Sequence, residues 1–228
     1  MRKLSVVIPA LSEEKSIEAV VKAVPKDELN EMGFDVQILV IDNGSKDRTG
    51  ELARQAGADV IVEPRVGYGR ALKTGFANAT GEIIATGDAD SSYPVDEIPQ
   101  LLAILEAEDL DFITTNRLAH LERDAMSFRN QLGNRVLSAT TRMLFAINLK
   151  DSQSGMWLLR KDLLNQLRLR SDGMAFSEEI KLGACYFAKC RWREVPIQYR
   201  RRVGDAKICA WRDGVQNLLF LARKRLVR

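Results

Sequence analysis

Two acidic residues, Asp88 and Asp90, stand one residue apart after an apolar run that begins at Ile83. Alternate residues of an extended chain point the same way, so both carboxylates can converge on one cation, and Ala89 between them leaves room for a ligand. Hard oxygen ligands suit Mg²⁺ or Mn²⁺, ions that often take their remaining ligands from the phosphates of a substrate. The stretch therefore predicts a site for a divalent metal and a diphosphate. The alternative is a turn whose Asp side chains only cap the next helix.

Alternating strands and helices in the first half of the chain position these carboxylates. The sequence pattern predicts strands at 4–9, 36–41, 60–62 and 83–86, and helices from about 12, from about 49 to 56, at 70–79 and at 95–106. This alternation is typical of an α/β fold with a mostly parallel central sheet and helices on both faces. Ligands of such sheets bind outside the carboxyl ends of the strands. Pro9, Asp42 and Asp88 all fall at such ends, so we expect them to share one crevice.

The second half of the chain is less regular. The pattern there predicts strands at 111–115, 155–160 and 191–199 and helices at 128–145, 177–188 and 213–228. No repeat or linker interrupts it. We therefore expect a single domain over residues 1–228, with a nucleotide-binding half at 1–120 and an acceptor-side half at 121–228 that ends in a basic helix.

Composition removes several classes of function. With 228 residues, 46% of them hydrophobic, the chain can bury a large core. The sequence shows no membrane-spanning run and no signal-peptide core, so a cytoplasmic protein is expected. Its single histidine, His120, argues against a His-based zinc site and against a Ser-His-Asp triad. The net charge of +3 is mild, but basic residues gather near the C-terminus, where we expect an anionic partner other than nucleic acid.

A short glycine-containing segment, Gly67-Tyr68-Gly69, precedes the helix predicted at 70–79. The third glycine of a dinucleotide-binding fingerprint is replaced by Leu72, and no P-loop motif is present, so both of those cofactor sites are disfavoured. Gly67 and Lys73 can still bring a backbone amide and a positive charge to a phosphate. The alternative is an ordinary turn at the start of a helix.

Three motifs in a fixed order carry a resemblance to a known family. They are the segments at 6–14, at 41–49 and at 87–90, with Gly87-Asp88-Ala89-Asp90 the last. In this order and spacing the chain resembles the family 2 glycosyltransferases with a GT-A fold. Within them it is most similar to the dolichyl- or polyprenyl-phosphate sugar transferases. The resemblance is strong over residues 4–120 and weaker at 153–157 and 199–207.

The resemblance implies roles for individual residues. Pro9, Ala10 and Glu13 match the loop along the nucleoside, Asp42 matches the acid that binds the base, and Asp47 belongs to the same nucleotide-binding run. Asp88 and Asp90 match the metal-binding acids, and Ser92 holds a position that in some relatives is a metal-binding Gln. The residues matched to phosphate and acceptor binding are Arg117, Arg129, Arg202, Ser154, Gly155 and Lys207. For each arginine, the alternative is a solvated surface charge.

The activity implied is inverting, metal-dependent transfer of a sugar from a UDP- or GDP-linked donor to a polyprenyl or dolichyl phosphate. Attack on the donor by a hydroxyl acceptor requires a general base, whereas a phosphate monoester is already ionised near neutral pH. Glu178 and Glu179 lie where relatives that act on hydroxyls place a carboxylate. They could act as a base, orient Arg202, or form the capped first turn of a helix. Two alternatives stay open: glycosylation of a saccharide or soluble hydroxyl, and a nucleotide-binding, membrane-associated protein without catalysis.

The C-terminal helix carries an apolar stripe with a basic flank. Val215, Leu218, Leu219, Ala222 and Leu226 share one helical face, and the flanking basic residues are Arg223, Lys224, Arg225 and Arg228. A helix of this kind lies in the headgroup region of an anionic bilayer. We therefore expect a cytoplasmic protein attached peripherally to the membrane. The alternative is that the stripe packs against the sheet.

Overall fold

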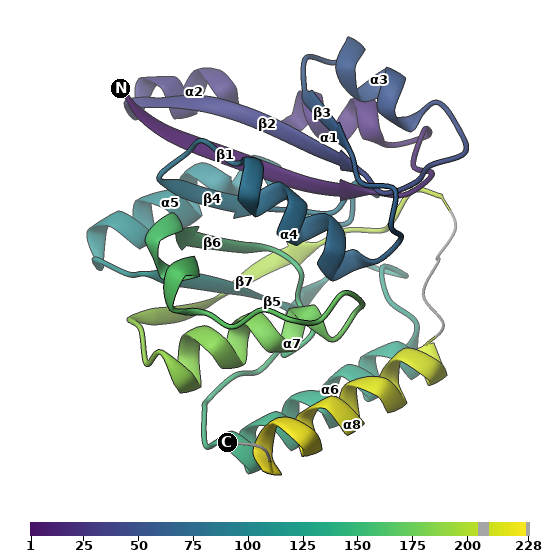
Figure 1. Ribbon diagram of the computed structural model, residues 1–228, viewed down its shortest axis with the longest axis vertical. Helices are drawn as coiled ribbons and strands as arrows, with labels where there is room; N and C mark the ends of the chain where they lie inside the picture. Colours follow the sequence, from purple (N-terminus) through teal and green to yellow (C-terminus); the bar gives the residue numbers. More distant parts are fainter. Residues whose placement is uncertain (205–209, 227–228) are drawn as a thin grey trace.

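Seven strands form one sheet in the computed structural model, which describes residues 1–204 and 210–226 (Figure 1). The strands are β1 (Arg2–Ala10), β2 (Phe34–Asp42), β3 (Asp59–Val62), β4 (Ile83–Thr86), β5 (Phe112–Leu121), β6 (Trp157–Arg160) and β7 (Trp192–Tyr199). Their order across the sheet is β3-β2-β1-β4-β6-β5-β7. Only β6 runs antiparallel to its neighbours among these strands. The predicted α/β class with a mostly parallel sheet is confirmed.

Helices cover both faces of this sheet. They are α1 (Ile17–Ala23), α2 (Lys26–Glu31), α3 (Thr49–Gln55), α4 (Tyr68–Asn78), the 3₁₀ turn η1 (Val95–Glu97), α5 (Ile98–Ala107), α6 (Phe128–Phe145), the 3₁₀ turn η2 (Lys161–Gln166), α7 (Phe176–Lys181), the π-helical η3 (Leu182–Phe187) and α8 (Ala210–Leu226). One core lies between the sheet and α1, α2, α3 and α5, and a second lies between the sheet and α4, α6, α7 and α8. β1 sits between β2 and β4 and is buried from Leu4 to Ala10, as a strand covered on both faces must be.

The structure differs from the predicted elements in several places, including the 3₁₀ turn η2, which was not predicted, and the predicted helix 177–188, whose second half is the π-helical η3. Helix α1 begins at Ile17 rather than near residue 12, because the segment before it forms a loop in which Ser12 has a φ of 54°. The short helix α2 was not predicted. Strand β5 continues to Leu121, and its pairing with β7 shifts register between Asn116 and His120.

Helices α6 and α8 lie side by side at the end of the molecule away from β2 and β3 (Figure 1). Leu221 of α8 and Leu137 of α6 belong to the second core. None of the helices in the described residues combines the length and the apolar composition needed to span a bilayer.

Candidate active site

The carboxyl ends of β1, β2 and β4 meet at one edge of the sheet. Ala10, the last residue of β1, is in register with Asp42, the last residue of β2. Thr86 ends β4 beside Val7 of β1, so the chain enters the Asp88 turn next to both. The three strand ends that were predicted to meet are therefore adjacent at this edge of the sheet.

Asp90 is held by the turn in which it lies. The backbone N–H of Ser92 donates to Asp90 Oδ1 at 3.0 Å, and the Ser92 hydroxyl donates to the same oxygen at 2.5 Å. The Ser16 hydroxyl fixes the turn from α1 by donating to the Ala89 carbonyl at 2.7 Å. Ser92 is fully buried, so its hydroxyl orients Asp90, and its role as a metal ligand stays a prediction.

Asp88 carries a perturbed carboxyl group. Burial first, and the nearby Asp90 carboxylate second, raise the pKa of Asp88 to about 7, while Tyr68 donates a hydrogen bond of 3.2 Å to its Oδ1. Two carboxylates this close repel each other, and a divalent cation between them relieves that repulsion. The described residues contain no cluster of three acidic, His or Cys ligands. Two carboxylates that leave the other positions to water and a diphosphate fit Mg²⁺ or Mn²⁺.

Arg202 reaches the same carboxylates from the end of β7. Its Nη1 lies 3.4 Å from Asp90 Oδ2, and its Nη2 donates to Glu13 Oε1 at 2.8 Å. The segment is held there by two backbone hydrogen bonds, from Val203 N–H to the Asp90 carbonyl and from Arg200 N–H to the Ser92 carbonyl. Arg202 Nε is buried without a partner in the structure. The sequence placed Arg202 and Glu13 in the site but did not show that they pair.

Arg117 is locked to Asp151, a residue that the sequence did not mark as part of the site. Its Nε and Nη2 donate to the two carboxylate oxygens of Asp151 at 2.8 and 2.9 Å, and its backbone N–H donates at 3.0 Å. Burial opposes the charged form of both groups, but their mutual attraction outweighs it, so the pKa of Asp151 is lowered and that of Arg117 is raised. The guanidinium also lies 5.4 Å from the centre of the Tyr199 ring.

Gly155 lies against the Asp88 carboxylate. Its N–H donates to the Tyr93 hydroxyl at 2.6 Å and its carbonyl accepts from Thr86 at 2.9 Å. A Cβ at this position would lie 2.4 Å from the Tyr68 hydroxyl and 3.6 Å from Asp88 Oδ1, so only glycine fits. The preceding Ser154 is fully buried.

The predicted nucleotide-side residues divide into two groups. Asp42 accepts a hydrogen bond of 2.9 Å from the Ser45 N–H with one oxygen. Asp47, by contrast, accepts a hydrogen bond with each of its carboxylate oxygens. Oδ1 accepts from the Thr49 N–H in the same loop, and Oδ2 accepts from the Glu14 N–H in the loop after β1. Asp47 thus shapes the loops around the crevice.

Gly67 and Lys73 pack against the segment before α7. The Gly67 N–H donates to Asn43 Oδ1 at 2.7 Å, and a Cβ there would lie 2.4 Å from the Asp172 carbonyl. Lys73 forms an ion pair with the Asp172 carboxylate. Their predicted contact with phosphate stays a prediction, while their observed contacts hold two loops together.

Glu178 and Glu179 do not contact Arg202. Glu178 is 1% exposed and accepts from the Gln153 side chain; burial raises its pKa to about 8, so it is protonated at neutral pH. Glu179 accepts from the N–H groups of Arg170 and Ser171 and pairs with Lys224 at 2.8 Å. The alternative in which these acids orient Arg202 is wrong, because the Arg202 guanidinium contacts Glu13 and Asp90 instead.

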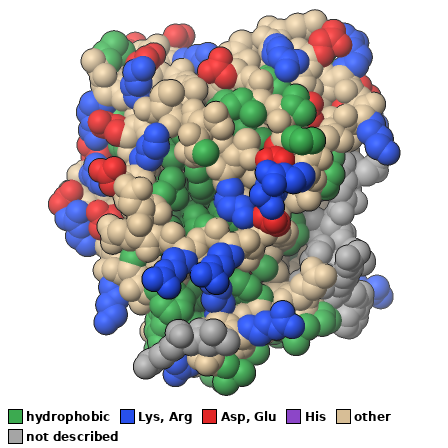
Figure 2. Space-filling view, in the orientation of Figure 1, with side chains coloured by type: hydrophobic (Ala, Val, Ile, Leu, Met, Phe, Trp, Pro, Cys, Tyr) green, Lys and Arg blue, Asp and Glu red, His purple; other side chains and the backbone are tan. Residues whose placement is uncertain are grey.

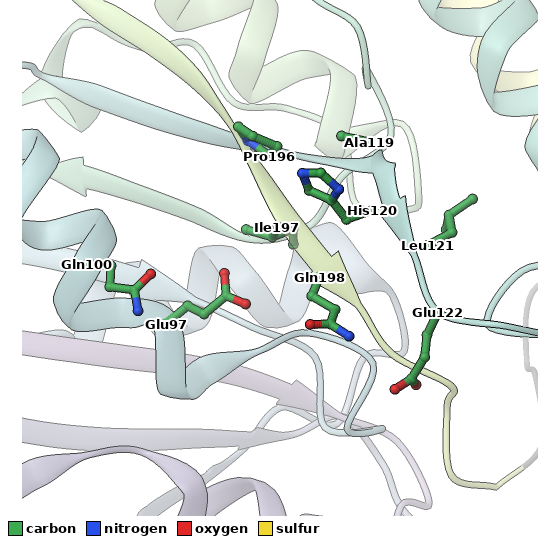
Figure 3. Close-up of a pocket in the computed structure, with 9 residues that line it drawn as sticks. All are labelled: Glu97, Gln100, Ala119, His120, Leu121, Glu122, Pro196, Ile197 and Gln198. Atoms are coloured by element: carbon green, nitrogen blue, oxygen red, sulfur yellow. The ribbon is translucent and has the colours of Figure 1, made fainter.

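Two further predicted residues lie elsewhere. Arg129 is exposed in the first turn of α6, and Lys207 lies outside the described residues. A separate hollow of about 640 Å³ contains His120 of β5, with Glu97 and Gln100 on one side and Gln198 of β7 on another (Figure 3). None of Asp88, Asp90, Glu13 and Arg202 lines it.

Comparison with known proteins identifies the family of the chain. Residues 5–168 match the model of the family described as glycosyl transferase family 2. A low-salt glycan biosynthesis hexosyltransferase of Haloferax volcanii is 33% identical over 96% of the chain, which spans 52% of that protein's length. A dolichyl-phosphate hexose transferase of the same organism is 28% identical over 92% of the chain and 89% of its own length.

A solved structure shares the fold. Glucosyl-3-phosphoglycerate synthase from Mycobacterium tuberculosis, crystallised with Mn²⁺, UDP-glucose and phosphoglyceric acid, superposes with a TM-score of 0.78. It is 23% identical and covers 100% of this chain and 81% of its own. The likeness shows the fold.

Proposed function

The chain belongs to glycosyl transferase family 2, and we propose that it transfers a hexose from a nucleoside diphosphate sugar to a polyprenyl phosphate, with inversion at the anomeric carbon. The observation that carries the choice of acceptor is that neither acid of α7 is open to an acceptor hydroxyl. Glu178 is 1% exposed and accepts from the Gln153 side chain, and Glu179 is committed to Lys224 and two backbone N–H groups. An acceptor that is already ionised needs no base from either residue.

Asp88 and Asp90 would hold a Mg²⁺ or Mn²⁺ ion, as the fit of two hard carboxylates indicates. Such an ion, when bound, supplies positive charge to the departing nucleoside diphosphate. The M. tuberculosis synthase was crystallised with Mn²⁺ and UDP-glucose, which supports the same requirement here. Ser92 keeps Asp90 in position, and Tyr68 does so for Asp88.

The arginines add positive charge close to these carboxylates. Arg202, next to Asp90, stabilises the negative charge that develops on the leaving diphosphate, because a preorganised cation needs no reorientation as the charge forms. Arg117 is fixed by Asp151 and can offer its remaining N–H groups to a phosphate. Attack from the face opposite the leaving group inverts the anomeric centre.

A second candidate acceptor is a soluble molecule. The synthase was crystallised with phosphoglyceric acid as well as UDP-glucose, and a small acceptor of that kind would also reach the crevice from solution. Purified protein should be given a panel of UDP- and GDP-linked sugars with Mn²⁺, and either a polyprenyl phosphate or soluble acceptors. We expect sugar to enter the organic phase with the lipid phosphate. Transfer only to water-soluble acceptors would overturn the lipid assignment.

The lipid acceptor implies contact with a membrane, and α6 and α8 offer a surface for it. Their side chains that share exposure and apolar character are Phe128, Leu132, Val136, Met143, Val215, Leu218, Leu219 and Leu226, here called the α6–α8 apolar surface. Figure 2 shows hydrophobic and cationic side chains together over the part of the molecule where these helices lie. The stripe predicted on α8 faces solvent, and the opposite face, with Leu221, packs inward. Lys224 is not part of the basic flank, because it pairs with Glu179.

Vesicle sedimentation tests this attachment. Replacing Leu132 and Leu219 by Ser should weaken binding to anionic vesicles, since both side chains are about half exposed and would enter the bilayer. Replacing Met32 and Val62 by Ser, two exposed apolar residues on the opposite part of the fold, is the matched control and should leave binding unchanged. Intact protein that stays in the supernatant at low salt would exclude peripheral attachment.

A further inference from the structure

A second hollow, apart from the site at Asp88 and Asp90, is lined by three basic residues. It lies between β5, α6 and the loop after α6, has a volume of about 350 Å³, and is bounded by Asn116, Leu118, Ala119, Arg135, Arg142 and Lys150. No lining residue is acidic. None of them was assigned to the sugar donor, the metal or the acceptor.

The three positive charges are not neutralised by neighbouring acids in the described residues. No ion pair forms there to Arg135, Arg142 or Lys150, and Arg142 Nη1 donates to the Leu149 carbonyl at 3.0 Å. Asp151, which follows Lys150, is bound to Arg117, and Glu194 accepts the backbone N–H of Lys150. Like charges that face one hollow repel each other, so an anion placed between them is stabilised.

The chemistry of the three groups favours phosphate. Arginine presents a planar fork of N–H donors that matches two oxygens of a phosphate, and lysine adds a compact charge. Asn116 also lines this hollow, and its Oδ1 accepts from the Leu118 N–H. Three basic residues from two segments therefore border a space that can hold one tetrahedral anion.

The position of the hollow indicates where the phosphate comes from. Arg135 and Arg142 are seven residues apart on α6, so they share a face, and each directly precedes an exposed apolar residue. Those residues, Val136 and Met143, are 48% and 79% exposed and belong to the α6–α8 apolar surface. A bilayer seated on that surface brings its headgroup phosphates to the level of these arginines.

We propose that the hollow lined by Arg135, Arg142 and Lys150 is a phosphate-binding site that holds the headgroup of an anionic phospholipid. It is distinct from the crevice at Asp88, and it sets the depth and rotation of the protein on the membrane. The assignment of the headgroup rests on the membrane attachment proposed above; the assignment of phosphate does not.

The phosphate assignment is tested first, by titrating the protein with inorganic phosphate and following the Nε–H signals of the arginines by NMR. We expect the signals of Arg135 and Arg142 to move saturably, and the movement at Arg142 to be lost in the Arg135→Gln/Lys150→Gln variant. The Lys3→Gln/Lys26→Gln variant removes the same charge from the far end of the sheet and should keep it. Signals that do not move, or that move equally in both variants, overturn the site.

The headgroup assignment is tested with vesicles of phosphatidylcholine containing phosphatidic acid. Arg135→Gln/Lys150→Gln should bind them roughly thirtyfold more weakly than wild type, as expected for two basic residues at the membrane surface, and Lys3→Gln/Lys26→Gln within about twofold. Transfer to a detergent-dispersed acceptor should be the same in both variants. Equal vesicle binding by the two variants overturns the headgroup assignment. Wild-type protein that does not bind the vesicles overturns membrane attachment instead. The NMR titration with inorganic phosphate then still decides whether the hollow binds phosphate.

Discussion

The two halves of the molecule hold their functional groups by different means. In residues 1–120, Asp42 and Asp88 stand at or just beyond strand ends and Asp90 is oriented by Ser92, two residues away. In the second half the groups are fixed by partners distant in sequence, such as Asp151 by Arg117 and Glu179 by Lys224. The first half thus places its carboxylates by strand ends and short turns, to which Tyr68 and Arg202 add contacts from farther along the chain, whereas the second half depends mainly on side-chain pairs. Substitutions should therefore affect chemistry in the first half and stability in the second.

The largest effect is expected at Asp90. Asp90→Ala removes a carboxylate proposed to hold the metal and should lower turnover on the order of 10³-fold, since preorganised charge of this kind contributes several kcal/mol. The midpoint of denaturant unfolding should fall only modestly, because loss of the hydrogen bonds from Ser92 and of the attraction to Arg202 is partly offset by relief of the repulsion from Asp88. Asp88→Ala should come close to the same loss. Full activity of both variants in the presence of a chelator would remove the metal from the mechanism.

A smaller loss of activity with a large loss of stability is expected at Asp151. Asp151→Asn keeps the shape but leaves Arg117 buried beside a neutral group, and breaking a buried pair in this way costs about 3–5 kcal/mol. Chemical denaturation measures this cost directly. If Asp151→Asn were as stable as wild type and lost only turnover, the Arg117–Asp151 pair would contradict the expectation that substitutions in the second half affect stability.

The sequence predicted the first half well because its signals are local. A strand followed by Asp88 and Asp90 can be recognised within eight residues, and the structure places that turn at the sheet edge. Asp151 was missed because its partner lies 34 positions away, and spacing carries no information about such a pair. On α8 the periodicity found the apolar stripe, but only packing against α6 shows that the stripe is exposed and that Leu221 on the other face is buried.

The next effect is a pH-dependent one at Glu178. In the folded protein burial raises its pKa from 4.5 to about 8, so between these values the folded state keeps a proton that the unfolded state loses. The stability linked to this proton is complete below pH 4.5 and is lost as pH rises to about 8. Glu178→Gln cannot titrate, so its stability relative to wild type should increase from pH 5 to pH 8, by on the order of several kcal/mol. The groups facing Glu178 are Gln153, Ser152 and Lys181.

Glu179→Gln is the matched control, because the pKa of Glu179 is lowered: burial raises it, but Lys224 and the Ser171 N–H outweigh burial. That carboxylate stabilises the fold above its unfolded pKa, so Glu179→Gln should be least stable, relative to wild type, at neutral pH and should recover as pH falls. With a phosphate acceptor, Glu178→Gln should lose no more than about tenfold in turnover. A loss of 10²–10⁴ at intact stability would make Glu178 a general base and favour a hydroxyl acceptor.

The smallest effect separates nucleotide affinity from stability with two glycines, one in each half. Gly50 lies at the second position of α3, and a Cβ there would come within 2.8 Å of Asp42 Oδ2. Gly50→Ala should therefore displace the Asp42 carboxylate and cost about one hydrogen bond to the base, a two- to tenfold weaker affinity for the nucleotide. Turnover at saturation should stay within twofold, since this contact is equal in the ground and transition states. Asp42→Ala should weaken affinity at least as much.

Gly133 of α6 is the control, because no atom lies within 4 Å of the position of its Cβ. Gly133→Ala should stabilise the protein by about 1 kcal/mol, the helix propensity gained over glycine, and should leave nucleotide affinity unchanged. Gly50→Ala gains helix propensity too, but its Cβ displaces the Asp42 carboxylate, which accepts from the Ser45 N–H, so this variant should melt below Gly133→Ala. Thermal shift with and without nucleotide separates this difference in stability from the difference in binding. Equal nucleotide affinity in both variants would mean that Asp42 does not bind the base, and the first half would then owe its affinity to contacts with the diphosphate alone.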